Sequence, residues 1–400
     1  MRTPTNPVRR RLLATGAGAV AVAGLGRAAG ALAADTAEAK LPPYVSWKDP
    51  RSMIVHTSST LETRRTAFGS SLITPADRLY IRNNLPAPSA AIVEDRDAWE
   101  VTFAGVRTPQ TLSVSQLKRM GLETIAMVLQ CSGNGRGLFP TKPSGTPWSV
   151  GAAGCIEWSG VPVQAVVDSL GGVADGMRFM TSTGGETLPA GINPLSVIVE
   201  RSVPLAAMQD ALLAWEMNGA PIPLAHGGPL RVIVPGYTGV NSVKYVKRLA
   251  FTAVETDAAI QKTGYRMSPP GQKGDPSQPS VWEMGVKSWI NSPAPEAGPV
   301  QAGPLMIRGV AFGGINALRK VDVSTDGGKS WKEARLVGAD LGRYAWRQFV
   351  LPVTLTPGTY AIACRAVDSR GNVQTEGRLE NTGGYSNSSW RDHSLQITVA

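Results

Sequence analysis

A change in sequence texture near Gly303 divides the chain into two regions of different structural class. Upstream, helical and strand-like apolar patterns are interspersed irregularly, which is typical of an α+β domain rather than of a repeated βαβ unit. Downstream, short alternating apolar runs are separated by turn signals such as Asp326-Gly327-Gly328, which is typical of a small all-β sandwich. We therefore expect an α+β domain over residues 35–290 and an all-β domain over residues 291–400.

Hydrophobic periodicity predicts individual elements within each region. The predicted helices cover residues 111–120 and 163–170, and the predicted strands cover residues 124–129, 231–234, 305–312, 320–324, 346–351 and 360–366. Residues 264–304 are dense in Pro, Gly and Ser, so we expect a long wrapped connection there.

Residues 1–34 have the composition of a bacterial export signal. Three arginines at positions 9–11 precede a mildly apolar stretch rich in Ala and Gly, and Ala31-Leu32-Ala33 is a small-residue cleavage pattern. Arg27 interrupts the apolar stretch, which is shorter than the ~20 residues of a spanning helix, so cleavage is favoured over a membrane anchor. We expect twin-arginine export, cleavage near Ala33-Ala34, and a periplasmic mature protein without a membrane anchor.

Composition excludes several classes of protein. The net charge is +10, but residues 1–33 hold five Arg and no acidic residue, so the remaining chain carries a modest +5. The body of the chain contains no basic run of the kind that binds nucleic acid, so no nucleic-acid partner is expected. Three Cys and three His, without HExxH spacing, argue against a disulfide scaffold and against zinc hydrolase chemistry.

Cys131 lies where a strand-like run ends and a glycine-rich loop, Ser132-Gly133-Asn134-Gly135-Arg136-Gly137, begins. Glycines let backbone N–H groups approach a cofactor or anion, and a neighbouring Arg favours a thiolate. A soft thiolate binds a transition metal or attacks an electrophile. On this stretch alone, a buried apolar Cys is the commoner alternative. Cys155 and Cys364 have no such motif and are expected in the core.

Other segments add to the motif around Cys131. They are Tyr80-Ile81-Arg82-Asn83-Asn84-Leu85-Pro86, Trp215-Glu216-Met217-Asn218-Gly219, His226-Gly227-Gly228-Pro229-Leu230-Arg231 and Ser242-Val243-Lys244. In this order they resemble the sulfite oxidase family of molybdenum enzymes and, more closely, its bacterial periplasmic sulfite dehydrogenases. The resemblance covers nearly the whole chain after residue 50.

The resemblance implies a fold and a cofactor. The fold is an α+β molybdopterin-binding domain of the sulfite oxidase type, followed by an immunoglobulin-like sandwich that mediates dimerisation, so a homodimer is expected. The cofactor is molybdenum held by molybdopterin, with the Cys131 thiolate as the protein ligand of the metal. The implied cofactor contacts are Asn83, Asn84, Cys131, Thr183, His226, Arg231, Ser242 and Lys244. Of these, Arg231 and Lys244 have the charge to receive a phosphate.

The resemblance also implies a substrate pocket for a small oxyanion. Arg82 and Arg136 match two arginines that line it, and a planar guanidinium can donate two N–H bonds to an oxyanion. Tyr265 matches an active-site tyrosine, and Trp148 matches a tryptophan of the pocket wall. The alternatives are surface ion pairs for the arginines and core packing for the aromatic residues.

Three positions depart from the family pattern. Asn84 stands where the family often has His, and Thr183 or a neighbour stands where the animal enzymes have an acidic cofactor contact. The family places a further substrate arginine near the C-terminus, but residues 381–387 contain none. Neither Arg378 nor Arg391 is assigned to that role.

The resemblance implies oxidation of sulfite to sulfate. The sequence has no Cys-x-x-Cys-His motif and no room for a haem domain, so we expect no haem and a separate periplasmic c-type cytochrome as electron acceptor. One alternative is reduction of nitrate or a sulfoxide by another molybdopterin oxidoreductase of the same superfamily. The other is a non-catalytic periplasmic binding module.

Overall fold

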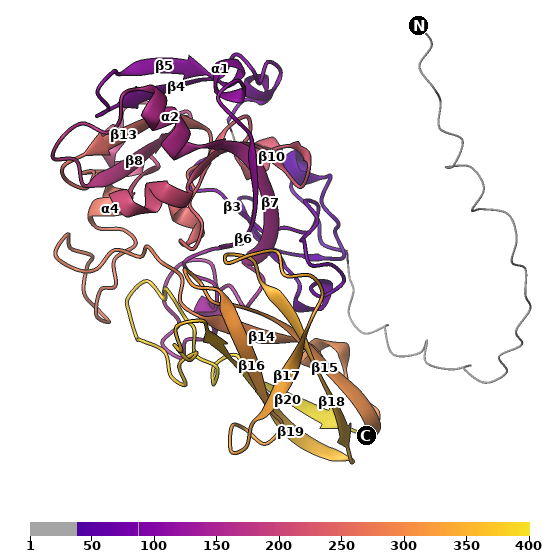
Figure 1. Ribbon diagram of the computed structural model, residues 1–400. Helices are drawn as coiled ribbons and strands as arrows, with labels where there is room; N and C mark the ends of the chain where they lie inside the picture. The colour runs from indigo at the N-terminus through magenta and orange to yellow at the C-terminus, as the bar shows by residue number, and fades with distance from the viewer. Residues whose placement is uncertain (1–37, 87) are drawn as a thin grey trace, which may run out of the picture.

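The computed structural model describes residues 38–86 and 88–400, so the expected export signal lies outside the described residues. Figure 1 shows two bodies, with the indigo-to-salmon N-terminal domain above the orange and yellow C-terminal domain. Within the described ranges, no helix is long and apolar enough to cross a membrane.

The N-terminal domain is built from three sheets. An antiparallel sheet contains β1 (Met53–Thr57), β2 (Thr60–Thr63) and β3 (Ile81–Arg82). A second contains β6 (Glu123–Gln130), β7 (Ala153–Pro162), β10 (Leu212–Met217), β11 (Ala220–Pro221) and β12 (Arg231–Ile233). A third has the order β5-β4-β13-β8-β9 and contains β4 (Glu100–Ala104), β5 (Gln110–Ser113), β8 (Phe179–Gly184), β9 (Glu200–Pro204) and β13 (Val246–Thr252). In this third sheet β13 and β4 are parallel, and the other pairs are antiparallel.

Helices of this domain are short. The α-helices are α1 (Val114–Lys118), α2 (Val163–Ser169), α3 (Pro194–Val197) and α4 (Ala259–Lys262). Short 3₁₀ helices cover Pro43–Val45, Arg65–Ala67, Ala90–Val93, Arg136–Leu138, Leu205–Asp210, Leu224–His226, Gly239–Asn241 and, at the start of the C-terminal domain, Pro295–Ala297.

Helix α2 shows how the apolar pattern anchors this domain. Val163, Val166 and Val167 are fully buried and share one core with the third sheet, which is the face that spacings of three and four residues create. The helix predicted over 163–170 is confirmed. The helix predicted over 111–120 is wrong at its start, because residues 110–113 pair with β4 as strand β5 and Ser113 then caps α1.

The C-terminal domain is a seven-stranded antiparallel sheet that closes around one core. Its order is β14-β15-β18-β17-β16-β19-β20, with β14 (Lys287–Ser292), β15 (Gly303–Phe312), β16 (Leu318–Ser324), β17 (Lys332–Val337), β18 (Arg347–Leu355), β19 (Gly358–Asp368) and β20 (Leu395–Val399). Ser288 of β14 contacts the Cys364 sulfur of β19 at 3.3 Å, so the sheet curls back on itself. The expected class, α+β followed by all-β, is confirmed.

Some expectations for this domain need correction. Strand β14 lies inside the expected connection 264–304, and the expected boundary at 290/291 falls within it. Strands β17 and β20 were not predicted, because their outward residues are polar or charged and mask the apolar alternation. Cys155 and Cys364 are buried in the core, as expected.

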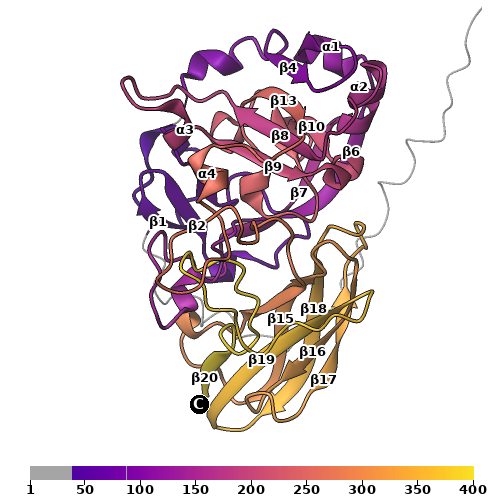
Figure 2. The same ribbon diagram turned by 90° about the vertical axis from the view of Figure 1, so that its left-hand side faces the viewer.

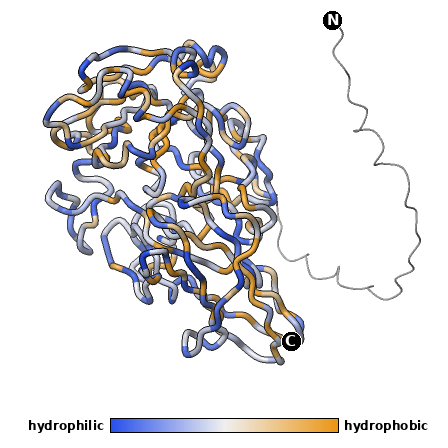
Figure 3. The backbone as a smooth tube through the Cα atoms, in the orientation of Figure 1, coloured by the Kyte–Doolittle hydropathy of each residue, from blue (hydrophilic) through white to orange (hydrophobic). Residues whose placement is uncertain are grey.

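The distribution of hydropathy follows the sheets. Figure 3 shows orange, apolar stretches running through the strands of both bodies, whereas many outer loops are blue or white. Between β19 and β20, a long yellow segment leaves the C-terminal domain and approaches the N-terminal domain (Figure 2). There Ser386 donates its backbone N–H to the carbonyl of Ser132 at 2.9 Å, so the two domains meet beside Cys131.

Candidate active site

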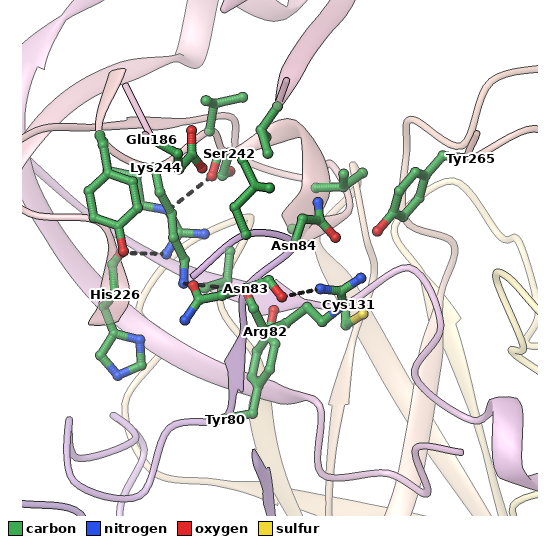
Figure 4. Close-up of a pocket in the computed structure, with 18 residues that line it drawn as sticks. Tyr80, Arg82, Asn83, Asn84, Cys131, Glu186, His226, Ser242, Lys244 and Tyr265 are labelled. Carbon is green, nitrogen blue, oxygen red and sulfur yellow. Dashed lines mark hydrogen bonds between the residues drawn. The ribbon is translucent and has the colours of Figure 1, made fainter. Parts of the chain in front are cut away.

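A cavity lies in the N-terminal domain, and both polar and apolar residues line it, as is common for cofactor sites. Its wall is built from the end of β3, the residue after β6, the start of β12 and the segment that follows β12. It brings together most of the predicted site residues: Arg82, Asn83, Asn84, Cys131, His226, Arg231, Ser242, Lys244 and Tyr265. Figure 4 shows Cys131 and Tyr265 on one side, and His226, Lys244 and Glu186 on the other.

Three predicted residues do not line this cavity. Thr183, on β8, donates its hydroxyl proton to Glu200. Trp148 is fully buried behind the wall, with its ring edge-on to Tyr80, which does line the cavity, at 6.2 Å. Arg136 donates from Nε and Nη1 to backbone carbonyls, and its remaining nitrogen, Nη2, makes no protein bond among the described residues.

The loop that carries Cys131 is locked by its own backbone and by Asn134. The Cys131 backbone N–H continues the sheet with a bond to the carbonyl of Ala152 at 2.9 Å. The Asn134 amide donates to Gln130 at 2.9 Å and accepts from the backbone of Ala152 at 3.1 Å. The Arg136 guanidinium packs against Gly133, where an added Cβ atom would lie 2.5 Å from it. This geometry holds the Cys131 sulfur at the cavity wall.

The opposite side of the cavity is strongly cationic. Arg231 donates to the carbonyls of Ser242 and His226, both at 3.0 Å, and Lys244 donates to the Asn83 side chain and the Ala225 carbonyl at 2.6 Å. Burial, reinforced by the charge of Arg231, holds the pKa of Lys244 well below its usual value. An anion bound here would offset that desolvation and repulsion.

His226 is nearly inaccessible, and Lys48, 178 residues away in sequence, lies behind it. Lys48 Nζ donates to the carbonyls of Ala76 and Leu79 and lies 2.8 Å from His226 Nε2. Burial first, and then the charge of Lys48, hold the pKa of His226 well below its usual range, so the imidazole is neutral. No sequence pattern points to Lys48.

Glu186 is a carboxylate that sequence reasoning missed. It lines the cavity three residues after Thr183, and its Oε2 atom is buried without a hydrogen-bond partner. Burial raises the pKa of Glu186 to about 7, although Lys244 opposes this. The expectation of an acidic cofactor contact at Thr183 or a neighbour is the signal that could have found it.

Tyrosines surround the side of the cavity next to Cys131. Tyr265 has a left-handed backbone, with φ of 50°, and burial raises the pKa of its phenol while Arg82 opposes that rise. Burial likewise raises the pKa of Tyr80. Both phenols therefore stay protonated and can donate hydrogen bonds. Tyr80 and Tyr385, which stacks on Tyr265, were not among the predicted site residues.

The residues present fit a molybdenum–pterin cofactor. A soft sulfur lies on one side, and cations that can receive a phosphate lie on the other. Between them, the Asn83 Nδ2 and Glu186 Oε2 atoms are buried polar atoms that lack protein partners. A bound heterocycle with N–H donors and carbonyl acceptors would satisfy both atoms.

Comparison with known proteins adds independent information. Residues 87–260 match the model of the oxidoreductase molybdopterin binding domain, and residues 278–399 match the Mo-co oxidoreductase dimerisation domain. The chain is 35% identical to sulfite oxidase of Gallus gallus, over 76% of this chain and 68% of that protein. It is 30% identical to sulfite oxidase of Arabidopsis thaliana, over 84% of this chain and 91% of that protein. The sulfane dehydrogenase SoxCD of Paracoccus pantotrophus superimposes with a TM-score of 0.71 at 26% identity, covering 87% of this chain and 88% of that one.

Proposed function

Because the chain belongs to the sulfite oxidase family of molybdopterin oxidoreductases, we propose that it is a molybdenum-dependent sulfite dehydrogenase. It would convert sulfite and water to sulfate, two protons and two electrons. One observation carries the proposal. The Cys131 sulfur lies in the wall of a cavity that also contains Arg82, Tyr265 and a buried cationic side.

The cofactor would be held by residues of different chemical character. Cys131 would bind the metal, and His226, Arg231 and Lys244 would hold the phosphate. Asn83 and Glu186, with their unpartnered atoms, would bond to the heterocycle. When bound, the molybdenum centre supplies an oxygen atom to sulfite and accepts its two electrons.

The protein's own residues bind and orient the oxyanion. Arg82 lies half-buried in the cavity wall, and its guanidinium charge would offset the charge of sulfite. The protonated phenol of Tyr265 would donate a hydrogen bond to a substrate oxygen. Arg136, fixed by two carbonyls, has Nη2 left to donate. Packing of Trp148 behind Tyr80 would keep this wall rigid.

The electron acceptor would be a separate c-type cytochrome in the periplasm, reached after twin-arginine export. The modest charge of the mature chain and the absence of a haem-attachment motif in the sequence support this arrangement. The match of residues 278–399 to a dimerisation domain supports a homodimer, which sedimentation of the purified protein would test.

Replacement of the metal ligand tests the function directly. We expect purified protein to contain molybdenum and to reduce ferricyanide or cytochrome c only when sulfite is added. Cys131→Ser should abolish turnover and the metal–thiolate absorption, because oxygen is a poorer ligand than thiolate for this soft site. Cys155→Ser, which alters a core thiol outside the cavity, is the control. Full sulfite turnover by Cys131→Ser would contradict the proposal.

A sulfane-sulfur substrate is the second candidate. The superimposed SoxCD is a sulfane dehydrogenase, and residues 381–387 lack the arginine that would add charge for a free dianion. Turnover with thiosulfate or a persulfide, but not with sulfite, would favour it. The match of residues 87–260 to an oxidoreductase domain disfavours a non-catalytic binding module. Reduction of nitrate or a sulfoxide would appear in the same assays when run with a reduced dye.

A further inference from the structure

A loop of the C-terminal domain, residues 381–387, forms part of the environment of Cys131. We call it the interdomain loop. It is tied to the Cys131 loop by Ser386 N to Ser132 O at 2.9 Å, Asn387 Nδ2 to Gly135 O at 3.1 Å, and Arg136 Nε to Gly383 O at 2.8 Å. These contacts place the side chain of Tyr385 against the active-site residues.

Tyr385 is one of the two aromatic rings in a four-part stack. Its ring lies parallel to that of Tyr265, with the centroids 5.1 Å apart and an angle of 18° between the planes. The Arg136 guanidinium covers Tyr385 at 5.3 Å, and Arg201 covers Tyr265 at 5.4 Å. The order is therefore cation, ring, ring, cation, in which each contact is attractive.

The stack fixes the side chains of Tyr265 and Arg136. Tyr265 has a positive φ, which a bulky residue adopts only when its surroundings favour it. Arg136 has its guanidinium fixed by Gly383 of the interdomain loop and by Tyr385. Burial raises the pKa of Tyr385 to about 12, so its phenol is neutral and its ring presents an uncharged face.

We propose that Tyr385 is a positioning residue for oxyanion recognition, acting through Tyr265 and Arg136. The inference rests on the proposed function. It also explains how the interdomain loop can lack an arginine. The loop orients Arg136 of the N-terminal domain instead of supplying a cation of its own. On this proposal the C-terminal domain takes part in substrate binding, in addition to the proposed dimerisation.

The test compares Tyr385→Ala and Tyr385→Phe in the cofactor-loaded enzyme. Equilibrium binding of sulfate, measured by calorimetry, gives a readout that is independent of turnover, and steady-state kinetics give KM and kcat for sulfite. Tyr385→Ala should weaken sulfate binding and raise the KM for sulfite by about tenfold, because it removes one stacked pair and one cation–π contact. The kcat should change by less than about threefold, since no reacting group is lost. Tyr385→Phe, which keeps the stacked ring, should restore most of the affinity.

Tyr360→Ala is the matched control, because Tyr360 is a half-buried tyrosine of β19 whose hydroxyl, among the residues that the structure describes, bonds to Thr356. Sulfate affinity within twofold of wild type in Tyr385→Ala would overturn the proposal, and so would an equal loss in Tyr385→Phe or in Tyr360→Ala. If Tyr385→Ala fails to fold, Tyr385→Leu keeps the apolar bulk without a stacked ring and answers the same question. Weakened sulfate binding in a chain that does not turn over sulfite would refute the proposed function and leave this inference standing.

Discussion

Single residues at the cavity carry most of its chemistry, and their charge states follow from burial. Lys244, His226 and Glu186 are all shifted toward their neutral forms, because desolvation outweighs the nearby charges. Burying these groups without a charged partner therefore costs folding free energy, and a charged ligand bound in the cavity would offset that cost. Such perturbed groups in one cavity are typical of a functional site.

Glu186 makes this cost measurable through pH. Its pKa rises from 4.5 to about 7 on folding, so between these values the native state binds a proton that the unfolded state has lost. The free energy of unfolding should therefore fall as the pH rises from about 4.5 to about 7. Urea unfolding of cofactor-free protein should show that Glu186→Gln removes this part of the pH dependence. Glu94→Gln, at an exposed position, is the control and should keep the wild-type pH dependence. If the difference in unfolding free energy between Glu186→Gln and wild type does not change with pH, the raised pKa of Glu186 is contradicted.

At the scale of elements, short loops at strand ends position the reacting groups. The Cys131 loop follows β6, and the end of the Arg136 side chain packs against Gly133 in this loop. Because a strand end is a rigid support, a small substitution in this loop should move the Arg136 guanidinium without changing the fold.

Gly133→Ala tests this relation. The added methyl group would lie 2.5 Å from the Arg136 guanidinium and displace it. We expect the KM for sulfite to rise by about tenfold or more, since a charge-assisted hydrogen bond contributes about 1.5–3 kcal/mol. The molybdenum content should stay the same. Gly377→Ala, at a position with open space around it, is the control, and an unchanged KM in Gly133→Ala would show that Arg136 does not bind the substrate.

At the scale of the whole molecule, the active site depends on both domains. Lys287 begins β14 of the C-terminal domain, is almost fully buried, and donates to the carbonyl of Asn134 in the Cys131 loop at 3.1 Å. Burial lowers the pKa of Lys287 to about 7, and its electrostatic interaction with Cys131 opposes this. The domain interface thus contains a buried amine that interacts with a residue of the candidate active site.

Lys287→Met should stabilise the protein in a pH-dependent way. Between about pH 7 and 10.5 the unfolded state binds a proton that the native state lacks, so wild-type stability rises with pH in this window. Calorimetry should therefore show that Lys287→Met raises the free energy of unfolding most, by about 1–4 kcal/mol, at or below pH 7. Near pH 10.5 the variant and the wild type should differ little. Lys332→Met, at an exposed position, should give no such trend. Destabilisation by Lys287→Met at pH 7 would show that the buried charge is already fully compensated.

Much of the architecture could be predicted because it depends on local patterns. Helix α2 follows from the spacing of Val163, Val166 and Val167, and the four predicted strands of the C-terminal domain follow from apolar alternation. Residues 110–113 were misassigned because pairing with β4, a tertiary contact, overrides their helical pattern. Strand β14 was missed because it lies among Pro- and Gly-rich segments that are typical of a connection.

The sequence by itself determined the two structural classes and the likeness to the family, and it pointed to most of the residues that line the cavity, because these reside in contiguous motifs. Only the tertiary structure decided that Arg136 faces Tyr385, that Thr183 pairs with Glu200, and that Glu186 enters the cavity. The physical reason is that burial, stacking and charge repulsion arise between residues far apart in the chain. Tyr265 and Tyr385 come from different domains, and their contact exists only once both domains have folded and docked.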